Sequence, residues 1–337
     1  MRSSVPRRSP AMAQQRMLTG ERPTGPLHLG HLFGTVANRV RLQQSGVETL
    51  LVLADYQVIT DREAPGDIAG NVREIVLDYL AAGIDPDAAT IFTHSAVPAL
   101  HQLMLPFLSL VSAAELERNP TVKQELADSG RSLSGLLLTY PVHQAADILF
   151  CHATVVPVGR DQLPHLEITR TIARRFTARY GPCFTEPEAL LSEAPTVLGT
   201  DGRKMSKSRG NAIELRATAD ETVRAIRSAK TDTDRHITYD PSSRPEVANL
   251  LLLASLCTGV PPEAIADEVG SRGAGHLKAL VADALVDHLA PLRARRALFA
   301  AEPGLVADIL AQGNAHANEL ADATIRDVRE LMGMVYA

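Results

Sequence analysis

Tryptophan is absent from this chain of 337 residues, and aromatic side chains make up only 4% of it. Cysteine is also scarce: the three residues Cys151, Cys183 and Cys257 are odd in number and far apart. This spacing fits neither a disulfide framework nor a cysteine-based zinc site, and it predicts the reducing cytoplasm as the compartment. No uninterrupted apolar run reaches the roughly 18 residues of a membrane-spanning helix, so we expect no membrane partner.

Positive charge is not in excess either, since the formal net charge is −5. The protein as a whole is therefore not a basic nucleic-acid coat, and a nucleic-acid partner would need a local basic face. Residues 1–16 carry arginines but no acidic residue and no apolar stretch of a secretory signal. We predict a flexible tail for this segment, with Met12 or Met17 as alternative starts.

Strand and helix patterns alternate in the first half of the chain. A short strand at 17–19 precedes a helical pattern at 29–44, a buried strand at 48–53, an amphipathic helix at 67–82 and a strand at 91–93. This alternation predicts an α/β fold with a parallel sheet covered by helices. The pattern continues with a helix at 96–118 broken at Pro106, a helix from 140 to 151, a strand at 154–159, a helix at 163–180 and a long loop at 181–210.

The pattern changes after Gly210. Thr218 and Glu221 form a capping box, which predicts a helix as far as Ala229. The segments 245–257, 261–269, 276–299 and 305–332 all have helical periodicity and almost no strand signal. We therefore predict a second, all-helical domain that begins near residue 211.

The first candidate site is the segment 23–31, Pro-Thr-Gly-Pro-Leu-His-Leu-Gly-His, a tight turn that leads into a helix. A helix start presents free N–H groups and positive potential to anions, and Gly30 allows a phosphate or a flat ring to approach the backbone. His28 and His31 share one helix face and can donate to phosphate oxygens. For this segment alone, a pair of surface histidines or half of a metal site is the alternative.

The second candidate site is the segment 204–208, Lys-Met-Ser-Lys-Ser, in a loop flanked by Gly199, Gly202 and Gly210. Two lysines on a hinged loop suit a triphosphate, because their charge can close on pyrophosphate as negative charge develops there. A solvated basic loop is the commoner explanation of such a run on its own. The two segments together are far more specific than either alone.

Together, these two segments resemble the two signatures of class I aminoacyl-tRNA synthetases. The segments 115–118, 137–141, 144–149, 156–162 and 249–251, with Lys123, are similar to tryptophanyl-tRNA synthetases more than to tyrosyl-tRNA synthetases. The resemblance covers residues 17–332. It implies an obligate homodimer with a Rossmann-type catalytic domain at 17–210, a helical anticodon-binding domain at 211–300, and a C-terminal helix at 301–337 that packs back on the catalytic domain.

The resemblance implies a pocket for the indole ring of tryptophan. Indole is apolar with one N–H that only donates, and Asp147 matches the carboxylate that accepts it through a charge-assisted hydrogen bond. A helix-surface acid is the alternative for Asp147. Tyr140 and Gln162 match the residues that hold the α-amino group, and Val156 and Val158 match walls of the pocket. The predicted tryptophan-binding set is Leu18, Gln57, Tyr140, Gln144, Asp147, Val156, Val158 and Gln162.

The resemblance also implies an ATP site, with Mg²⁺ that travels with the nucleotide. Catalysis is assigned to His28, His31, Lys204 and Lys207, which would contact the phosphates. Gly159 and Asp161 match the ribose contacts. The predicted ATP-binding set is Arg22, Pro23, Thr24, Gly30, His31, Lys123, Gly159, Arg160, Asp161, Val197, Lys204, Met205, Ser206, Lys207 and Ser208.

Several positions depart from the residues that the family uses most often. The altered positions are Leu18, Arg22, His28, His31, Gln57 and Gln144. These changes leave the catalytic set intact but alter the amino-acid pocket. We therefore hypothesise an auxiliary second copy of the enzyme that binds tryptophan-mimicking inhibitors poorly and, lacking tryptophan itself, can be translated when tryptophan is scarce.

The predicted function is ATP-dependent attachment of L-tryptophan to tRNA(Trp) through a tryptophanyl-adenylate. The alternatives are a tyrosyl-tRNA synthetase, a nucleotidyltransferase that makes a dinucleotide cofactor, and a non-catalytic synthetase-like regulator that binds tRNA or a protein. The lysine loop disfavours the second alternative, and the intact lysines and histidines disfavour the third. Candidate tRNA phosphate contacts are Arg224, Arg227, Lys230, Arg293, Arg295 and Arg296, for which a solvated helix face is the slightly favoured alternative.

Overall fold

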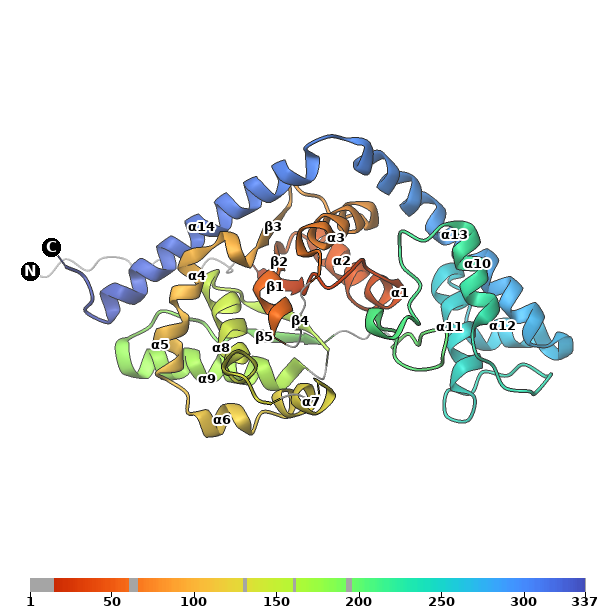
Figure 1. Ribbon diagram of the computed structural model, residues 1–337, viewed down its shortest axis with the longest axis horizontal. Coiled ribbons are helices and arrows are strands. Elements are labelled where there is room, and N and C mark those ends of the chain that lie inside the picture. Colours follow the sequence, from red (N-terminus) through yellow and green to blue (C-terminus); the bar gives the residue numbers. More distant parts are fainter. Residues whose placement is uncertain (1–14, 61–65, 130–131, 160–161, 192–195, 337) are drawn as a thin grey trace, which may run out of the picture.

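The computed structural model describes residues 15–60, 66–129, 132–159, 162–191 and 196–336, so residues 1–14 of the predicted tail lie outside it. Its centre is a parallel sheet with the strand order β3-β2-β1-β4-β5 (Figure 1). The strands are β1 (Arg16–Glu21), β2 (Glu48–Leu53), β3 (Ala89–Thr93), β4 (Val155–Val158) and β5 (Glu188–Leu191). The predicted fold class, a parallel α/β sheet followed by a helical region, is confirmed.

Helices cover both faces of this sheet and make up the C-terminal part of the chain. In the first part they are α1 (Leu29–His31), a π-helical segment (Leu32–Val36), α2 (Ala37–Gln44), α3 (Ile68–Ala82), α4 (Pro98–Gln102), α5 (Met104–Leu108), α6 (Ala113–Glu117), α7 (Pro120–Ser129), α8 (Gly135–Phe150) and α9 (Leu163–Tyr180). The second part contains α10 (Ala219–Ser228), α11 (Pro245–Thr258), α12 (Pro262–Val269), α13 (Ala274–Ala301) and α14 (Leu305–Leu331). Short 3₁₀-helices follow β2 (Asp55–Ile59) and β3 (His94–Ala96).

Three local predictions were wrong. Helix α8 begins at Gly135 rather than near Tyr140, because the Ser134 hydroxyl caps it by accepting from Leu137 N, and Pro141 lies inside the helix. Burial of nearly the whole of α8 compensates for the hydrogen bond that a proline removes. The helix predicted at 96–118 is divided into α4, α5 and α6, and the loop predicted at 181–210 contains the edge strand β5.

Strand β2 divides the core into two layers, because its side chains alternate between the sheet faces. Leu51 and Leu53 join the cluster that also holds α3 and the C-terminal helices. Leu50 and Val52 join the cluster formed by α4, α8, α9 and the end of α14. At Gly20 on β1, a Cβ atom would lie only 2.0 Å from the Val52 carbonyl oxygen, so only glycine allows this approach.

The last helix, α14, runs along the outer edge of the sheet beside β3 (Figure 1). A Cβ atom at Gly313 would lie 1.9 Å from the Ile91 carbonyl oxygen, so the missing side chain lets the helix contact the strand backbone. Asn314 Oδ1 accepts from Thr93 N at 3.0 Å, and the Asn318 amide donates to Ala96 O at 2.7 Å. Helix α14 therefore covers the exposed edge of β3, where unpaired backbone groups would otherwise meet solvent.

The helical region directly contacts the segment 23–31, the first motif. Residues 213–215 lie antiparallel to 27–29, with Leu29 N donating to Ile213 O and Leu215 N donating to Leu27 O, both at 3.0 Å. Buried Asp78 on α3 accepts from Leu27 N at 3.0 Å and from Arg296 Nε on α13 at 2.7 Å. One carboxylate thus joins the helical region to the turn that carries the first motif.

The arginines on α13 that were candidates for tRNA binding are engaged within the chain. Arg296 pairs with Asp78 and Glu74, Arg295 Nε donates to Ala81 O, and the Arg293 guanidinium donates to Ala217 O and to the Thr222 hydroxyl. These contacts hold α13 against α3 and α10. Within the described residues, no single helix is long and apolar enough to cross a membrane, although the bent pair Pro245–Thr258 and Pro262–Arg272 passes by length and composition together.

Candidate active site

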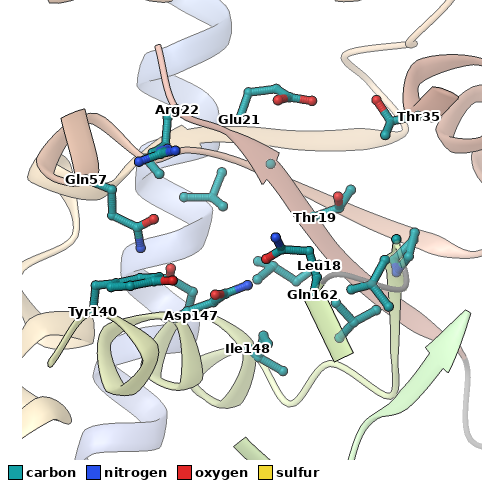
Figure 2. Close-up of a pocket in the computed structure, with 18 of the residues that line it drawn as sticks. Leu18, Thr19, Glu21, Arg22, Thr35, Gln57, Tyr140, Asp147, Ile148 and Gln162 are labelled. Carbon is teal, nitrogen blue, oxygen red and sulfur yellow. The ribbon is translucent and has the colours of Figure 1, made fainter. Parts of the chain in front are cut away.

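A cavity of about 310 Å³ lies at the carboxyl ends of β1, β2 and β4, between the sheet and α8 (Figure 2). Loops that follow parallel strands meet at this edge, where α/β folds place their ligands. All eight residues predicted to bind tryptophan line it: Leu18, Gln57, Tyr140, Gln144, Asp147, Val156, Val158 and Gln162. Arg22 and Gly159, predicted for ATP, line it as well.

Asp147 is the buried acid of this cavity, with 3% of its surface exposed. Figure 2 shows it on α8 beneath the space between Gln57 and Gln162. Its Oδ1 lies 2.7 Å from Nε2 of His94, a residue that the sequence analysis did not select. Burial raises the pKa of Asp147, but the close contact with His94 outweighs it and holds the net pKa below the usual value. The cavity therefore contains an ionised carboxylate whose orientation is fixed by His94.

Tyr140 lies about two helical turns before Asp147 on the same helix, since α-helices have 3.6 residues per turn. Its hydroxyl lies 2.7 Å from His165 Nε2. Burial and the neighbouring Glu125 carboxylate raise the pKa of Tyr140 above its ordinary value, so the phenol stays protonated. Glu125 also lines the cavity and lies 3.7 Å from the Arg22 guanidinium. It is a second acidic group that the sequence analysis missed, because nothing in the sequence of α7 distinguishes it from other helix acids.

The first motif forms the start of α1 and the turn before it. His28 is the N-cap and is buried, and its ring lies 3.8 Å from the ring of His31. Burial, with the nearby charge of Lys207, lowers the pKa of His28 to about 3; burial, with Lys207 and Arg39, lowers that of His31 to about 4 despite the opposing effect of Glu21. Both rings are therefore neutral at pH 7.

The tautomer of His31 follows from one contact. The backbone N–H of His28 donates to His31 Nδ1 at 3.2 Å, so Nδ1 must be an acceptor. In a neutral ring the proton is then on Nε2. This nitrogen lies 3.9 Å from Glu21 Oε2. His31 can thus donate one hydrogen bond through Nε2 without carrying a charge.

The segment 204–208, the second motif, lies against the first motif. The Lys207 ammonium donates to Gly25 O, and the Cβ atom of Met205 lies 3.7 Å from where a Cβ of Gly30 would be. Asn211, which is buried, holds this loop: its Oδ1 accepts from Ser206 N at 2.8 Å and its Nδ2 donates to Asp201 Oδ1 at 2.6 Å. The structure therefore brings together two segments that are more than 170 residues apart in the sequence.

A buried charged network lies next to these motifs. Arg39 on α2 is 3% exposed; it donates to the Tyr79 hydroxyl at 2.9 Å and to Thr19 Oγ1 at 3.0 Å, and it pairs with Glu21 at 3.0 Å. Burial raises the pKa of Glu21, but Arg39 outweighs it and the net pKa lies below the usual value. Arg39 and Glu21 line the cavity (Figure 2 labels Glu21), and the sequence analysis missed both because an arginine on a short helix is most often solvated.

The remaining predicted ATP residues are not all near the cavity. Lys123 and Lys204 are exposed, on α7 and in the loop of the second motif. Val197 is buried in the core beneath that loop, where its carbonyl accepts from Met205 N. Pro23 and Thr24 form the turn before the first motif, in which Thr24 N donates to Arg22 O. Arg160, Asp161 and the side chain of Ser208 lie outside the described part of the structure.

Three histidines surround the far side of Asp147, and the sequence analysis did not single them out. They are His94 after β3, His101 on α4 and His143 on α8. Burial lowers the pKa of His143 to about 4, and it also lowers that of His101. They come from three segments of the chain, so only the spacing of His143 and Asp147 could have indicated a cluster.

Comparisons with known proteins identify the family of this chain. A family profile described as "tRNA synthetases class I (W and Y)" matches residues 12–290. A tryptophan--tRNA ligase of Clostridium longisporum is 40% identical over 96% of this chain and 98% of its own length, and one of Treponema pallidum is 41% identical over 95% and 97%. The crystal structure of tryptophanyl-tRNA synthetase from Campylobacter jejuni complexed with ADP and tryptophan has a TM-score of 0.81 and 29% identity, and covers 95% of this chain and 100% of that one.

Proposed function

The chain belongs to the class I tRNA synthetases of the tryptophan and tyrosine group, and we propose that it is a tryptophan--tRNA ligase that activates tryptophan with ATP. The observation that carries the proposal is the cavity around Asp147. A buried, ionised acceptor fixed in orientation suits a bulky apolar ring with a single N–H donor. The relatives named above as tryptophan--tRNA ligases match nearly the whole chain, which supports the same choice.

We propose that the amino-acid end of the cavity reads the indole through Asp147, with Val156 and Val158 against the ring. Tyr140 and Gln162 receive the α-ammonium group, and the neighbouring Glu125 adds a negative charge on the same side. Phenylalanine has no polar hydrogen on its ring, so it would leave Asp147 buried without the ligand donor. Tyrosine is the closer competitor, because its hydroxyl also donates.

The first reaction step is an in-line attack of the tryptophan carboxylate on the α-phosphorus of ATP. The bond from this phosphorus to the bridging oxygen breaks, tryptophanyl-adenylate forms and pyrophosphate leaves. In the second step a terminal ribose hydroxyl of tRNA attacks the adenylate carbonyl carbon and AMP leaves. No protein nucleophile is needed, so the protein acts by positioning and by stabilising developing charge.

The two motifs supply that stabilisation in the proposed mechanism. Lys207, held beside Gly25, and Lys204 meet the charge that moves onto pyrophosphate. His31 donates to a phosphate oxygen through its Nε2 proton, and buried His28 supports that ring at 3.8 Å. Because both histidines are neutral, the positive charge at this end comes from the lysines. Mg²⁺ would enter bound to the phosphates and add charge there.

We propose that residues 211–300 form the anticodon-binding domain and that two chains associate as a homodimer. With Arg293, Arg295 and Arg296 engaged inside the chain, the exposed Arg224 and Arg227 on α10 and Lys230 after it are the better candidates for tRNA phosphates. The cytoplasm stays the predicted compartment.

Amino-acid-dependent exchange of pyrophosphate into ATP, run with all twenty amino acids, tests the proposed function. We expect exchange with tryptophan, weak exchange with tyrosine and none with phenylalanine. Preferential exchange with tyrosine would replace the proposal with a tyrosine enzyme. Exchange with no amino acid, in protein that is folded, would leave only a regulatory role.

The auxiliary role stays a hypothesis, and its test uses the altered pocket positions. If Leu18 and Gln57 weaken tryptophan mimics, the double change Leu18→Phe with Gln57→His should lower the inhibition constant of an indole-based inhibitor while the KM for tryptophan changes less. If the inhibition constant and the KM for tryptophan change equally, Leu18 and Gln57 do not discriminate against inhibitors.

A further inference from the structure

The histidine and carboxylate cluster behind the cavity has the arrangement of a metal site. His143 and Asp147 are four residues apart on α8 and therefore lie on one face of that helix. His94 joins them from the end of β3. One ligand atom from each of the three residues lies within 4.8 Å of the other two, and all three side chains are buried, with at most 3% of their surface exposed.

A fourth residue, His101, orients one member of the cluster. His101 Nε2 lies 2.8 Å from the His94 carbonyl oxygen, which can only accept, so this nitrogen carries a proton. In a neutral His101 ring, Nδ1 is then an acceptor, and His143 Nε2, at 2.9 Å, donates to it. The lone pair of His143 is consequently on Nδ1. Metal-binding histidines usually donate their second ring N–H to an outer acceptor in this way.

The contact between His94 and Asp147 supplies the other two donors. Nε2 of His94 and Oδ1 of Asp147 are 2.7 Å apart. Within the described part of the chain, His94 Nδ1, His94 Nε2 and Asp147 Oδ1 are all buried, and none of them makes a hydrogen bond of acceptable geometry, even at the 2.7 Å contact between the last two. A histidine buried with an unpartnered nitrogen costs free energy unless a ligand is present or the ring can move to reach one.

We propose that His94, His143 and Asp147 form a binding site for a zinc-type transition metal ion, with His101 as the outer residue that orients His143. Two imidazoles and one carboxylate suit Zn²⁺ and disfavour Mg²⁺, which prefers oxygen ligands. Tetrahedral zinc with bonds of about 2.0–2.2 Å would separate its donors by about 3.4 Å, so side-chain rotations within the cluster suffice to form the site. The metal would lie between His94 Nε2 and Asp147 Oδ1, which are 2.7 Å apart.

The proposed site has a consequence for the cavity, and this part rests on the proposed function. Three protein ligands leave the fourth position of a tetrahedral ion open to water or to a small ligand. Asp147 both belongs to the cluster and lines the cavity. A metal bound to Oδ1 would fix the carboxylate while leaving its other oxygen for the indole N–H. We therefore expect bound metal to change the affinity for tryptophan.

Metal binding itself is the first test, and it does not depend on catalysis. Full-length protein without a histidine tag is treated with a chelator, dialysed and titrated with Co²⁺, which reports four-coordinate nitrogen and oxygen ligands by its visible absorption. Zn²⁺ is then added in competition and the bound metal is measured by elemental analysis. We expect one ion per chain, with Zn²⁺ displacing Co²⁺. Absence of saturable binding would overturn the proposal and identify the cluster as a hydrogen-bond network alone.

Variants locate the bound ion. His143→Gln should abolish stoichiometric binding, and His101→Gln should weaken it by about 10- to 100-fold, because it removes only an outer partner. His316→Gln, at an exposed position on α14, is the matched control and should bind like the unchanged protein. If His143→Gln fails to fold, His101→Gln carries the test, since its ring is only partly buried. Unchanged affinity in His101→Gln and in a folded His143→Gln protein would overturn the assignment.

The two proposals can fail separately. If the protein exchanges pyrophosphate with tryptophan but binds no Zn²⁺, the proposed function stands and the metal site is overturned. If it binds Zn²⁺ through His143 but activates no amino acid, the metal site stands and the proposed function is overturned. With both present, the dissociation constant for tryptophan should differ between metal-free and Zn²⁺-loaded protein, and an equal constant would remove the link between the two.

Discussion

The two ends of the proposed active site are built in different ways. At the proposed amino-acid end, Tyr140, Gln144 and Asp147 all come from one buried helix, α8, and line the cavity, and His94 lies against the carboxylate. At the proposed phosphate end, the first and second motifs lie outside the lining of that cavity, come from distant segments and meet through contacts such as that of Lys207 with Gly25.

This difference suits the different tasks of the two ends. Recognition of a rigid ring needs acceptors that are already in place, and a buried helix supplies them. Stabilising a charge that appears only in the transition state needs groups that strengthen their contacts late, which a loop can provide. The phosphate end should therefore depend on distant supports, whereas the amino-acid end should depend on α8 and its immediate neighbours.

The largest expected effect comes from removing the contact between Arg296 and Asp78, which connects the helical region to the turn of the first motif. Arg296→Met leaves Asp78 buried without its cation, which should lower the free energy of unfolding by about 3–5 kcal/mol. Because Asp78 also accepts from Leu27 N, the turn before α1 should loosen and adenylate formation should fall. Urea unfolding and pyrophosphate exchange measure the two effects.

The control for this prediction is Arg224→Met, an exposed arginine on α10, which should change stability by no more than about 0.5 kcal/mol. Tryptophan affinity should change little in either variant. A loss of tryptophan binding in Arg296→Met under conditions where the protein is folded would contradict the separation of the two ends.

The second prediction concerns the transition state directly. Lys207→Ala should reduce the rate of adenylate formation by about 10²- to 10³-fold, because it removes a cation from developing pyrophosphate charge. The dissociation constant for tryptophan should stay within about twofold, since the contact strengthens only during reaction. Rapid-quench measurement of adenylate gives the rate.

The dissociation constant is accessible from the fluorescence of the bound tryptophan, because the protein contributes no tryptophan of its own. Lys230→Ala, which removes an exposed cation paired with Glu246, is the matched control. Equal losses in rate and in affinity would mean that Lys207 acts on the ground state and that the two ends are not separate.

The third prediction addresses the amino-acid end. Asp147→Asn preserves the shape of the side chain but removes its charge, so tryptophan affinity should fall by about 10- to 100-fold, as expected for loss of a charge-assisted hydrogen bond. An analogue methylated on the indole nitrogen cannot donate and should bind both proteins poorly. If the unchanged protein binds this analogue as well as tryptophan, Asp147 does not read the indole N–H.

The sequence predicted the helices and strands whose bounds depend on neighbouring residues alone. Strand β2 and helix α9 lie at the predicted bounds, because a continuous apolar run and a full helical period need no distant partner. Helix α8 begins before Pro141, at Gly135, because burial of nearly the whole helix outweighs the local breaker. The segment 96–118 is divided, and Ser112 caps the separate helix α6 within it. Strand β5 is an edge strand of only four residues, too short for a strand pattern, so only its pairing with β4 reveals it.

The same division applies to the site. Asp147 and Lys207 were predicted from motifs, in which the residue types and their spacing stand together in the sequence. His94, Arg39 and Asn211 were missed because each acts through a contact with a residue far along the chain. A histidine, an arginine or an asparagine in isolation carries no signal of what it will contact after folding.

The smallest expected effect tests whether a local change in the helical region reaches either end of the site. Thr218 caps α10 by accepting from Glu221 N at 3.2 Å, and the Glu221 carboxylate accepts from Thr218 N at 2.8 Å. Thr218→Ala should lower the free energy of unfolding by about 1 kcal/mol, the usual cost of losing a cap. Ser228→Ala, at the other end of the same helix, should change it less, since the Ser228 hydroxyl is exposed.

Neither change at α10 should alter tryptophan affinity or the rate of adenylate formation, because the contact of Arg293 with Thr222 ties α10 to α13. The capping pair also predicts a direction with pH. Hydrogen bonds from the Thr218 backbone and hydroxyl lower the pKa of Glu221, so their stabilisation is present above the unfolded pKa and is lost as the pH falls through the folded one. The stability difference between Thr218→Ala and the unchanged protein should therefore shrink in acid. A difference that grows in acid, or a rate of adenylate formation that follows stability across these variants, would show that the phosphate end depends on the whole helical region rather than on Asp78 and Arg296.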